Sequence, residues 1–212
     1  MGIEAFEKLS PEKQHSILQA GIQEFSQKSF LDASTDTITQ QAGISKGLLF
    51  HYFGSKKSFY LACLRYALDR LIAQTPEATQ NDFYSILFFT MDEKIRLCRD
   101  FPAETLFVNL AARDSSAEIS AEKLSLFTNY LAVTTKASRE VLARAISTLP
   151  LSNPNDPTLL DALSLYIGAI NQKYLLIYRE KPFEFFEHAA QIQAEMKTYI
   201  DYLLYGVVKQ EG

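Results

Sequence analysis

The chain has 212 residues, of which 47% are hydrophobic, so it can bury the core of one large domain or of two modest ones. Its apolar runs, such as residues 163–170, are less than half as long as the ~18 uninterrupted residues that a membrane-spanning helix needs. Residues 1–10 lack the basic start and apolar stretch of a secretory signal. We therefore expect a soluble, cytoplasmic protein without a membrane partner.

The formal net charge of −4 argues against nucleic-acid binding, but a duplex responds to local charge rather than to the total. Residues 37–68 contain no Asp or Glu, while Lys46, Lys56, Lys57 and Arg65 are positive and His51 can add to them. Chance or an ordinary solvated face would also explain this acid-free window. Charge alone therefore leaves DNA binding open.

Helix signals recur along the chain, and no period-two alternation with turn residues accompanies them, which predicts an all-α fold of about nine helices. Ser10 can cap an opening helix whose first position suits Pro11. Beyond residue 55, helices are predicted over residues 55–73, 82–99, 102–112, 116–147, 157–180 and 182–208. Asp156 is expected to cap the helix that Pro157 opens, and Pro182 opens the last one similarly.

Between these segments lie two short helices joined by a glycine turn. Ser34 can cap the first, which ends near Gln41, and Gly43 suits the sharp turn after it. Ser45 can cap the second, which extends to Phe53. This arrangement is the sequence form of a helix-turn-helix, whose second helix lies in the DNA major groove.

The groove position assigns a role to most side chains of the second helix. Lys46 and Leu48 should face base edges, and Gly47 should let the backbone approach closely. His51 and Tyr52 are better placed for the DNA backbone; a closed aromatic core is the alternative for Tyr52 and the preferred interpretation for Phe50 and Phe53. The expected DNA-binding set is Ser34, Thr35, Thr37, Ser45, Lys46, Gly47, Leu48, His51, Tyr52, Ser55, Lys56 and Lys57, the last three at a helix start where free amides favour phosphate.

Residues 42–53, AGISKGLLFHYF, followed by Ser55-Lys56-Lys57, resemble the signature of TetR/AcrR-type (tetracycline-repressor-like) regulators. The resemblance extends over about residues 11–68. It implies a helix-turn-helix over residues 34–53, an operator-binding homodimer whose last two long helices form a four-helix bundle, and a ligand cavity in the C-terminal part. Phe50 departs from the usual phosphate-binding Tyr, and Thr35 and Thr39 replace apolar or small residues, which suggests a variant subgroup.

A polar break over residues 74–82, which includes Pro76, predicts a boundary between a DNA-binding domain (residues 1–73) and a ligand-binding and dimerisation domain (residues 74–212). Apolar stripes on the last two helices could complete the monomer's core or form a dimer, and pattern alone does not decide. The resemblance favours a dimer, with the expected interface at Leu163, Ile167, Ile170, Phe186, Ile200 and Leu203.

Aromatic residues are dense in the C-terminal part, and some of them could line a cavity for a lipophilic effector. The polar members proposed for such a pocket are Arg113, Tyr130, Asn171 and Tyr174. By analogy with the family, a filled pocket would move the helix over residues 55–73. That movement would change the spacing between the helix-turn-helix regions of the two copies, which we call the reading heads.

The sequence therefore predicts a ligand-responsive transcriptional regulator, by default a repressor, whose partners are a palindromic double-stranded operator, a second copy and a small effector. No enzyme is expected, because no metal-like cluster, phosphate loop or nucleophile-and-base set accompanies the three histidines. Cys63 and Cys98 are interpreted as buried thiols, and no cofactor or metal is expected. The alternative is a helical scaffold or adaptor without a DNA site.

Overall fold

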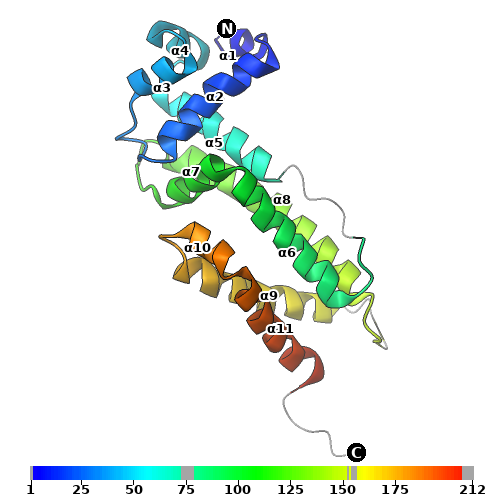
Figure 1. Cartoon of the computed structure of the whole chain (residues 1–212). Coiled ribbons are helices and arrows are strands. Elements are labelled where there is room, and N and C mark those ends of the chain that lie inside the picture. Colours follow the sequence, from blue (N-terminus) through cyan, green and yellow to red (C-terminus); the bar gives the residue numbers. More distant parts are fainter. Residues whose placement is uncertain (1, 73–78, 152, 154–156, 207–212) are drawn as a thin grey trace, which may run out of the picture. The chain divides into compact units, whose positions relative to one another are not determined.

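The computed structural model describes residues 2–72, 79–151, 153 and 157–206, and within them it contains eleven helices and no strand (Figure 1). The predicted all-α fold is confirmed. The chain forms two compact units, one from residues 1–75 and 96–134 and the other from residues 76–95 and 135–212. None of the helices in the described part is both long and apolar enough to cross a membrane.

The first unit contains the N-terminal helices and α7, together with the first half of α8 (Figure 1). Their bounds are α1 (Gly2–Glu7), α2 (Pro11–Phe25), α3 (Thr35–Ala42), α4 (Lys46–Phe53), α5 (Lys56–Ile72), α7 (Pro102–Arg113) and α8 (Ser120–Ile146). The second unit contains α9 (Pro157–Ile177), α10 (Pro182–Glu187) and α11 (Ala189–Tyr205), the second half of α8 and most of α6 (Phe83–Asp100). Both α6 and α8 thus have residues in each unit.

A buried aromatic cluster joins α2, α5 and α7. The Phe25 ring stacks on Phe107 at 5.5 Å between centroids and meets the Tyr60 ring edge-on at 4.8 Å. Phe30, from the loop after α2, packs edge-on against the same Tyr60 ring at 5.3 Å. Because these rings interlock, the three helices share one core.

The predicted caps of the first helices are confirmed. The side-chain oxygen of Ser10 accepts a hydrogen bond from Lys13 N at 3.3 Å, and Ser34 and Ser45 act in the same way at the starts of α3 and α4. Cys63 and Cys98 are buried, as expected. Burial raises the pKa of the Cys63 thiol well above its usual range, which makes it unreactive.

Three helix boundaries differ from the prediction. Helix α1 was missed because six residues show no period; it depends on Phe6, whose ring packs on Phe53 at 4.8 Å. Helix α8 begins at Ser120, after a turn over residues 117–119, and the expected last helix is divided at His188. The expected features at Ala73, Pro76, Asp156 and Val208 lie outside the described residues.

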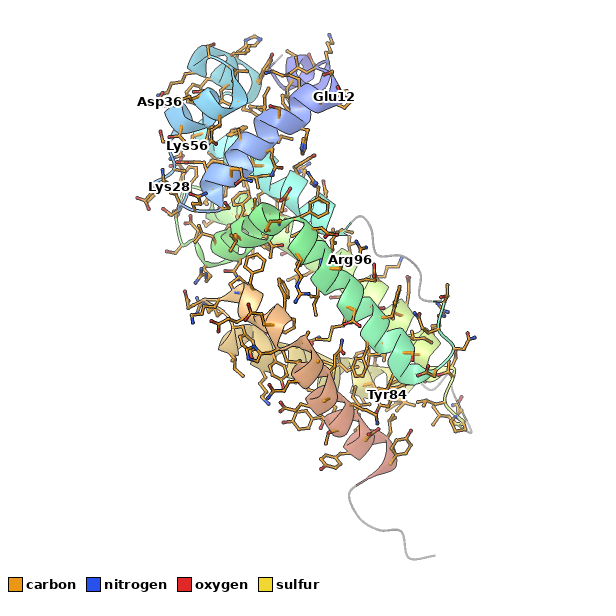
Figure 2. The ribbon with its side chains drawn as sticks, in the orientation of Figure 1. Glu12, Lys28, Asp36, Lys56, Tyr84 and Arg96 are labelled. Atoms are coloured by element: carbon orange, nitrogen blue, oxygen red, sulfur yellow. The ribbon has the colours of Figure 1, made fainter. Side chains whose placement is uncertain are left out.

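The second unit has its own core, formed where α9 and α11 pack with residues of α6 and α8. Buried side chains of α9 and α11 include Leu163, Ile170 and Ile200. At its polar edge, the Tyr84 hydroxyl of α6 donates to Asp201 of α11 at 2.5 Å (Tyr84 is labelled in Figure 2). The predicted boundary near residue 74 separates functional domains and stays a prediction. The compact units are divided differently, because residues 96–134 pack with the N-terminal helices.

The close approach of α2 to α5 gives a test of the first unit's core. A Cβ atom on Gly21 would lie 2.6 Å from both Cys63 Sγ and the Phe59 ring, and both side chains are fully buried. We expect Gly21→Ala to lower the free energy of unfolding by about 1–3 kcal/mol in urea denaturation, because overpacking forces the helices apart. Gly47→Ala, in the same unit, meets nothing closer than 3.9 Å and should raise stability by about 0.5–1 kcal/mol. Equal effects of the two variants would contradict this packing.

Candidate nucleic-acid interface

The two short helices α3 and α4 form the predicted helix-turn-helix. Gly43 lies between them in the left-handed region, at φ 62° and ψ 40°, and its N–H bonds back to the last turn of α3. Ile38 of α3 and Leu49 and Phe53 of α4 are buried and hold the two helices against the rest of the unit. The opposite side of α4 is left for solvent.

The DNA-binding residues predicted from sequence separate by exposure. The exposed ones are Ser45, Lys46, Gly47, His51 and Ser55. Half-buried are Ser34, Thr35, Thr37, Leu48, Lys56 and Lys57. The first turn of α4 therefore presents Lys46, Gly47 and part of Leu48 together, as the prediction for a groove-facing end requires.

Tyr52 differs from the expectation that it faces DNA. Only 9% of its surface is exposed, and its ring packs edge-on against Phe6 of α1 at 5.9 Å between centroids. The missed helix α1 explains the difference, because it covers the side of α4 from which Tyr52 would have reached the DNA backbone. Most of the Tyr52 side chain serves packing, and its phosphate contact stays a prediction.

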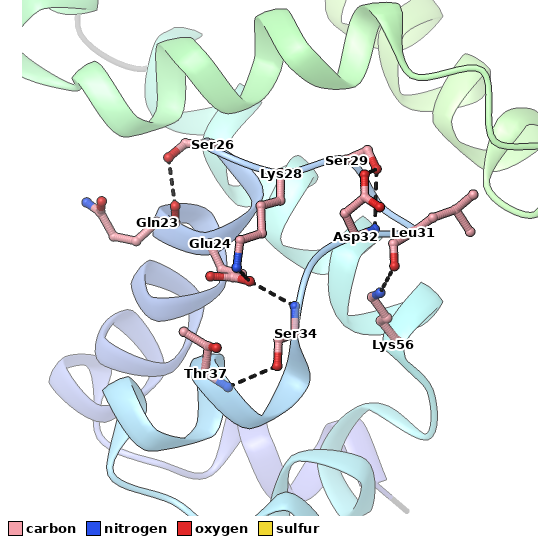
Figure 3. Close-up of polar contacts among 10 residues, drawn as sticks. All are labelled: Gln23, Glu24, Ser26, Lys28, Ser29, Leu31, Asp32, Ser34, Thr37 and Lys56. Carbon is pink, nitrogen blue, oxygen red and sulfur yellow. Dashed lines mark hydrogen bonds and ion pairs between the residues drawn. The ribbon is translucent and has the colours of Figure 1, made fainter.

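The loop before α3 is held by a buried carboxylate (Figure 3). Glu24, near the end of α2, accepts hydrogen bonds at 2.8 Å from Lys28 Nζ and from the backbone N–H of Ser34. Ser34 in turn caps α3 by accepting from Thr37 N at 3.3 Å. Burial opposes ionisation of Glu24, but the bonds from Lys28 and Ser34 outweigh it and lower the pKa of the carboxyl.

A second carboxylate ties the same loop to the end of α7. Asp114 accepts the backbone N–H of Phe30 and that of Ser116, each at 2.8 Å. Burial opposes the charge of Asp114, but hydrogen bonds from Ser116 and Phe30 and the nearby Lys123 ammonium lower the pKa of the Asp114 carboxyl. Lys123 is buried and donates to the backbone oxygens of Ala111 and Asp114.

Three lysines lie at the start of α4 and the start of α5, a surface that we call the reading face, and all three have partners within the chain. Lys46 pairs at 2.9 Å with Asp36, an exposed residue of α3 that is labelled in Figure 2. Lys56 donates to the Leu31 carbonyl at 3.1 Å (Figure 3). It also lies 5.1 Å from the Phe30 ring centroid. Lys57 pairs with Glu122, in the first turn of α8, at 2.7 Å. Sequence reasoning found the lysines and missed their partners.

The residues proposed for an effector pocket do not gather within one unit. Arg113 and Tyr130 belong to the first unit, and Asn171 and Tyr174 to the second. Asn171 is exposed, and the buried Tyr174 hydroxyl donates to the Glu195 carboxylate. Glu195 also accepts from Lys173 and Tyr199, and these hydrogen bonds lower the pKa of its carboxyl to about 2.

The residues proposed for the dimer interface differ in their burial within the single chain. Leu163, Ile170 and Ile200 are buried in the core of the second unit, so a partner chain cannot reach them. Ile167 and Phe186 are half-buried, and Leu203 is exposed. The exposed apolar side of α9 is instead the stripe of Leu165, Gly168, Ala169, Leu175 and Leu176.

Comparison with known proteins identifies the helix-turn-helix region. Residues 17–63 match the family model described as "Bacterial regulatory proteins, tetR family". The helix-turn-helix region of this chain is therefore similar to that of TetR-family regulators.

Two curated relatives are similar to part of the chain. The HTH-type transcriptional regulator RutR of Escherichia coli (strain K12) is 38% identical over 100 residues, which is 45% of this chain and 46% of RutR. The HTH-type transcriptional regulator BetI of Brucella canis is 33% identical over 64 residues, or 30% of this chain and 32% of BetI. The chain thus matches less than half the length of these relatives.

A crystal structure of a TetR family transcriptional regulator from Chloroflexus aurantiacus J-10-FL has a fold similar to that of this chain. The TM-score is 0.54 with 98% of both chains covered, and the sequences are 20% identical. The fold is thus similar over 98% of both chains, although the sequence identity is low.

The Glu24 carboxylate provides a test of how the reading head is positioned. We expect Glu24→Ala to lower the free energy of unfolding by about 1–3 kcal/mol in urea denaturation, because the N–H of Ser34 loses its acceptor. Gln23→Ala, its exposed neighbour on the same helix, should change stability by less than about 0.5 kcal/mol.

The same site has a defined pH dependence. Because the folded pKa of Glu24 lies below its ordinary value of 4.5, the carboxylate stabilises the fold above that pH, and the contribution is lost as the pH falls through the folded pKa. The stability difference between wild type and Glu24→Gln should therefore shrink below about pH 4.5. A difference that is constant with pH would show that the charge has no role.

Proposed function

We propose that this protein is a TetR-family transcriptional regulator, by default a repressor, that binds a two-fold symmetric DNA operator as a homodimer and is released by a small effector. The observation that carries the proposal is the exposed first turn of α4, where Lys46 and Gly47 stand free of the core on a capped helix of a TetR-type helix-turn-helix. RutR and BetI, which are similar to part of this chain, are named as transcriptional regulators. Such a protein would act in the cytoplasm.

The local chemistry supports DNA as the partner. A Lys and the edge of Leu48 at the start of α4 offer one hydrogen-bonding group and one apolar group for base edges. Helix α5 begins within a few residues, at Lys56, and its free first-turn amides favour an anion such as phosphate. Phosphate contacts at α5 would position the duplex, and α4 would specify its sequence.

The exposed stripe of α9 supports a second copy of the chain as the other partner. Leu165 is 75% exposed, and Leu175 and Leu176 are more than half exposed on the same helix. Gly168 and Ala169 lie between them and allow close approach of a facing helix. Two-fold pairing through this stripe would match a palindromic operator.

The effector part of the proposal rests on the resemblance to the family. A small ligand releases DNA only if it binds one arrangement of the protein better than the other. A difference worth about 1–3 kcal/mol would weaken operator binding by about 5- to 150-fold. Arg113, Tyr130, Asn171 and Tyr174 remain the polar residues to vary in an effector screen.

Selection from random duplex DNA tests the reading head. The purified protein should enrich a two-fold symmetric site, and Lys46→Ala and Leu48→Ala should change which bases are preferred, because both residues face base edges. About six phosphate contacts would give a log–log salt slope of about −5. No enrichment at moderate salt would reject operator binding and leave the helical scaffold.

Sedimentation equilibrium tests the dimer. Leu165→Glu should convert dimers to monomers, because it places a charge in an apolar interface. The matched control is Leu31→Glu, a similarly exposed leucine of the first unit, which should leave the dimer intact. A dimer that survives Leu165→Glu would place the interface elsewhere.

A further inference from the structure

The ion pair between Lys57 and Glu122 joins the start of α5 to the start of α8 within the first unit. Lys57 Nζ lies 2.7 Å from Glu122 Oε1, and the two side chains are 30% and 51% exposed. The lysine is the second residue of α5, where the free amides of the first turn already favour an anion. A carboxylate of the chain therefore sits beside the place where a phosphate would bind.

The other two lysines of the reading face differ in where their partners lie. Asp36, the partner of Lys46, belongs to α3 and therefore moves with the helix-turn-helix. Lys56 bonds to the Leu31 carbonyl in the loop that precedes α3. Only Lys57, among these three, is paired with a residue of α8, a helix that has residues in both compact units.

We propose that Glu122 is an internal competitor for operator phosphate, which holds Lys57 in the DNA-free protein and releases it when a phosphate binds at the start of α5. The inference rests on the proposed DNA-binding function. An unpaired Lys57 could bind a phosphate without breaking an ion pair within the protein. The paired Lys57 must first separate from Glu122, which reduces the net free energy of phosphate binding. The position of the first turn of α8 thereby sets part of the affinity for DNA.

The size of the effect follows from the exposure of the pair. Exposed ion pairs contribute little to stability, so freeing Lys57 should raise DNA affinity by about 1.4- to 5-fold. The gain should be larger at low salt, because screening at high salt weakens the pair that is being removed. A hydrogen bond from Lys57 lowers the pKa of the Glu122 carboxyl, so the competitor stays charged at neutral pH.

The experiment is a double-mutant cycle on DNA affinity. Fluorescence anisotropy with the duplex enriched by selection compares wild type, Glu122→Gln, Lys57→Met and the double variant at 50 and 200 mM salt, concentrations at which phosphate binding differs strongly. Glu140→Gln is the matched control, because it removes the same charge from an exposed position of the same helix. Melting temperatures show whether each variant is folded.

We expect Glu122→Gln to bind about 1.4- to 5-fold more tightly than wild type, Glu140→Gln to bind as wild type, and Glu122→Gln to have no effect in the Lys57→Met background. Unchanged affinity of folded Glu122→Gln, or an equal gain in the Lys57→Met background, would overturn the competitor while leaving operator binding intact. A wild-type protein that enriches no duplex would instead reject the proposed function itself.

Discussion

The stacking of Phe25 on Phe107 determines where the helix-turn-helix is held. Phe25 ends α2 and Phe107 lies in α7, and Tyr60 of α5 packs edge-on against both. All three side chains are almost completely buried, so a shift of one helix would require the other two to move. Helix α7 is therefore part of the support of the reading head, although more than 35 residues separate it from α4.

Polar contacts then fix what the aromatic core leaves free. Without them, only the buried side chains of Phe30 and Ala33 would hold the loop between α2 and α3 to the core. Glu24 binds the N–H of Ser34 at one end of this loop, and Asp114 binds the N–H of Phe30 in its middle. Both carboxylates accept hydrogen bonds from backbone N–H groups that would otherwise need water. These bonds favour the charged form, so burial does not keep the carboxyl groups protonated. The start of α3 is thus positioned by α2 and by the end of α7 together.

The parts of this structure that the sequence predicted are local. Capping by Ser10, Ser34 and Ser45 and the left-handed turn at Gly43 depend on neighbours within a few residues, so they were found correctly. Helix phase in the second unit was not local: α9 has apolar residues on two sides, and periodicity cannot say which side faces inward. Leu163 proved to be core and Leu165 exposed.

Contacts between residues far apart in the chain could not be predicted either, because they too depend on features that are not local. The burial of Tyr52 depends on Phe6, 46 positions earlier in a helix too short to show a period. The window over residues 37–68 is free of acid along the chain, but in space Asp36 lies next to Lys46 and Glu122 next to Lys57. The sequence could identify the basic residues of the interface, but not the carboxylates with which Lys46 and Lys57 are paired in the folded chain.

These ion pairs change how much each lysine of a basic surface contributes to DNA affinity. A lysine that is paired with a carboxylate, as Lys46 and Lys57 are, must exchange that partner for a group of the DNA, so its contribution to DNA affinity is the difference between two interactions. That difference is small enough to be altered by a modest displacement of the internal partner. For Lys46 the partner is carried by the reading head itself and the difference is fixed, whereas for Lys57 the partner is carried by α8. In the regulator that we propose, a change in α8 could therefore alter DNA affinity without any movement of α4.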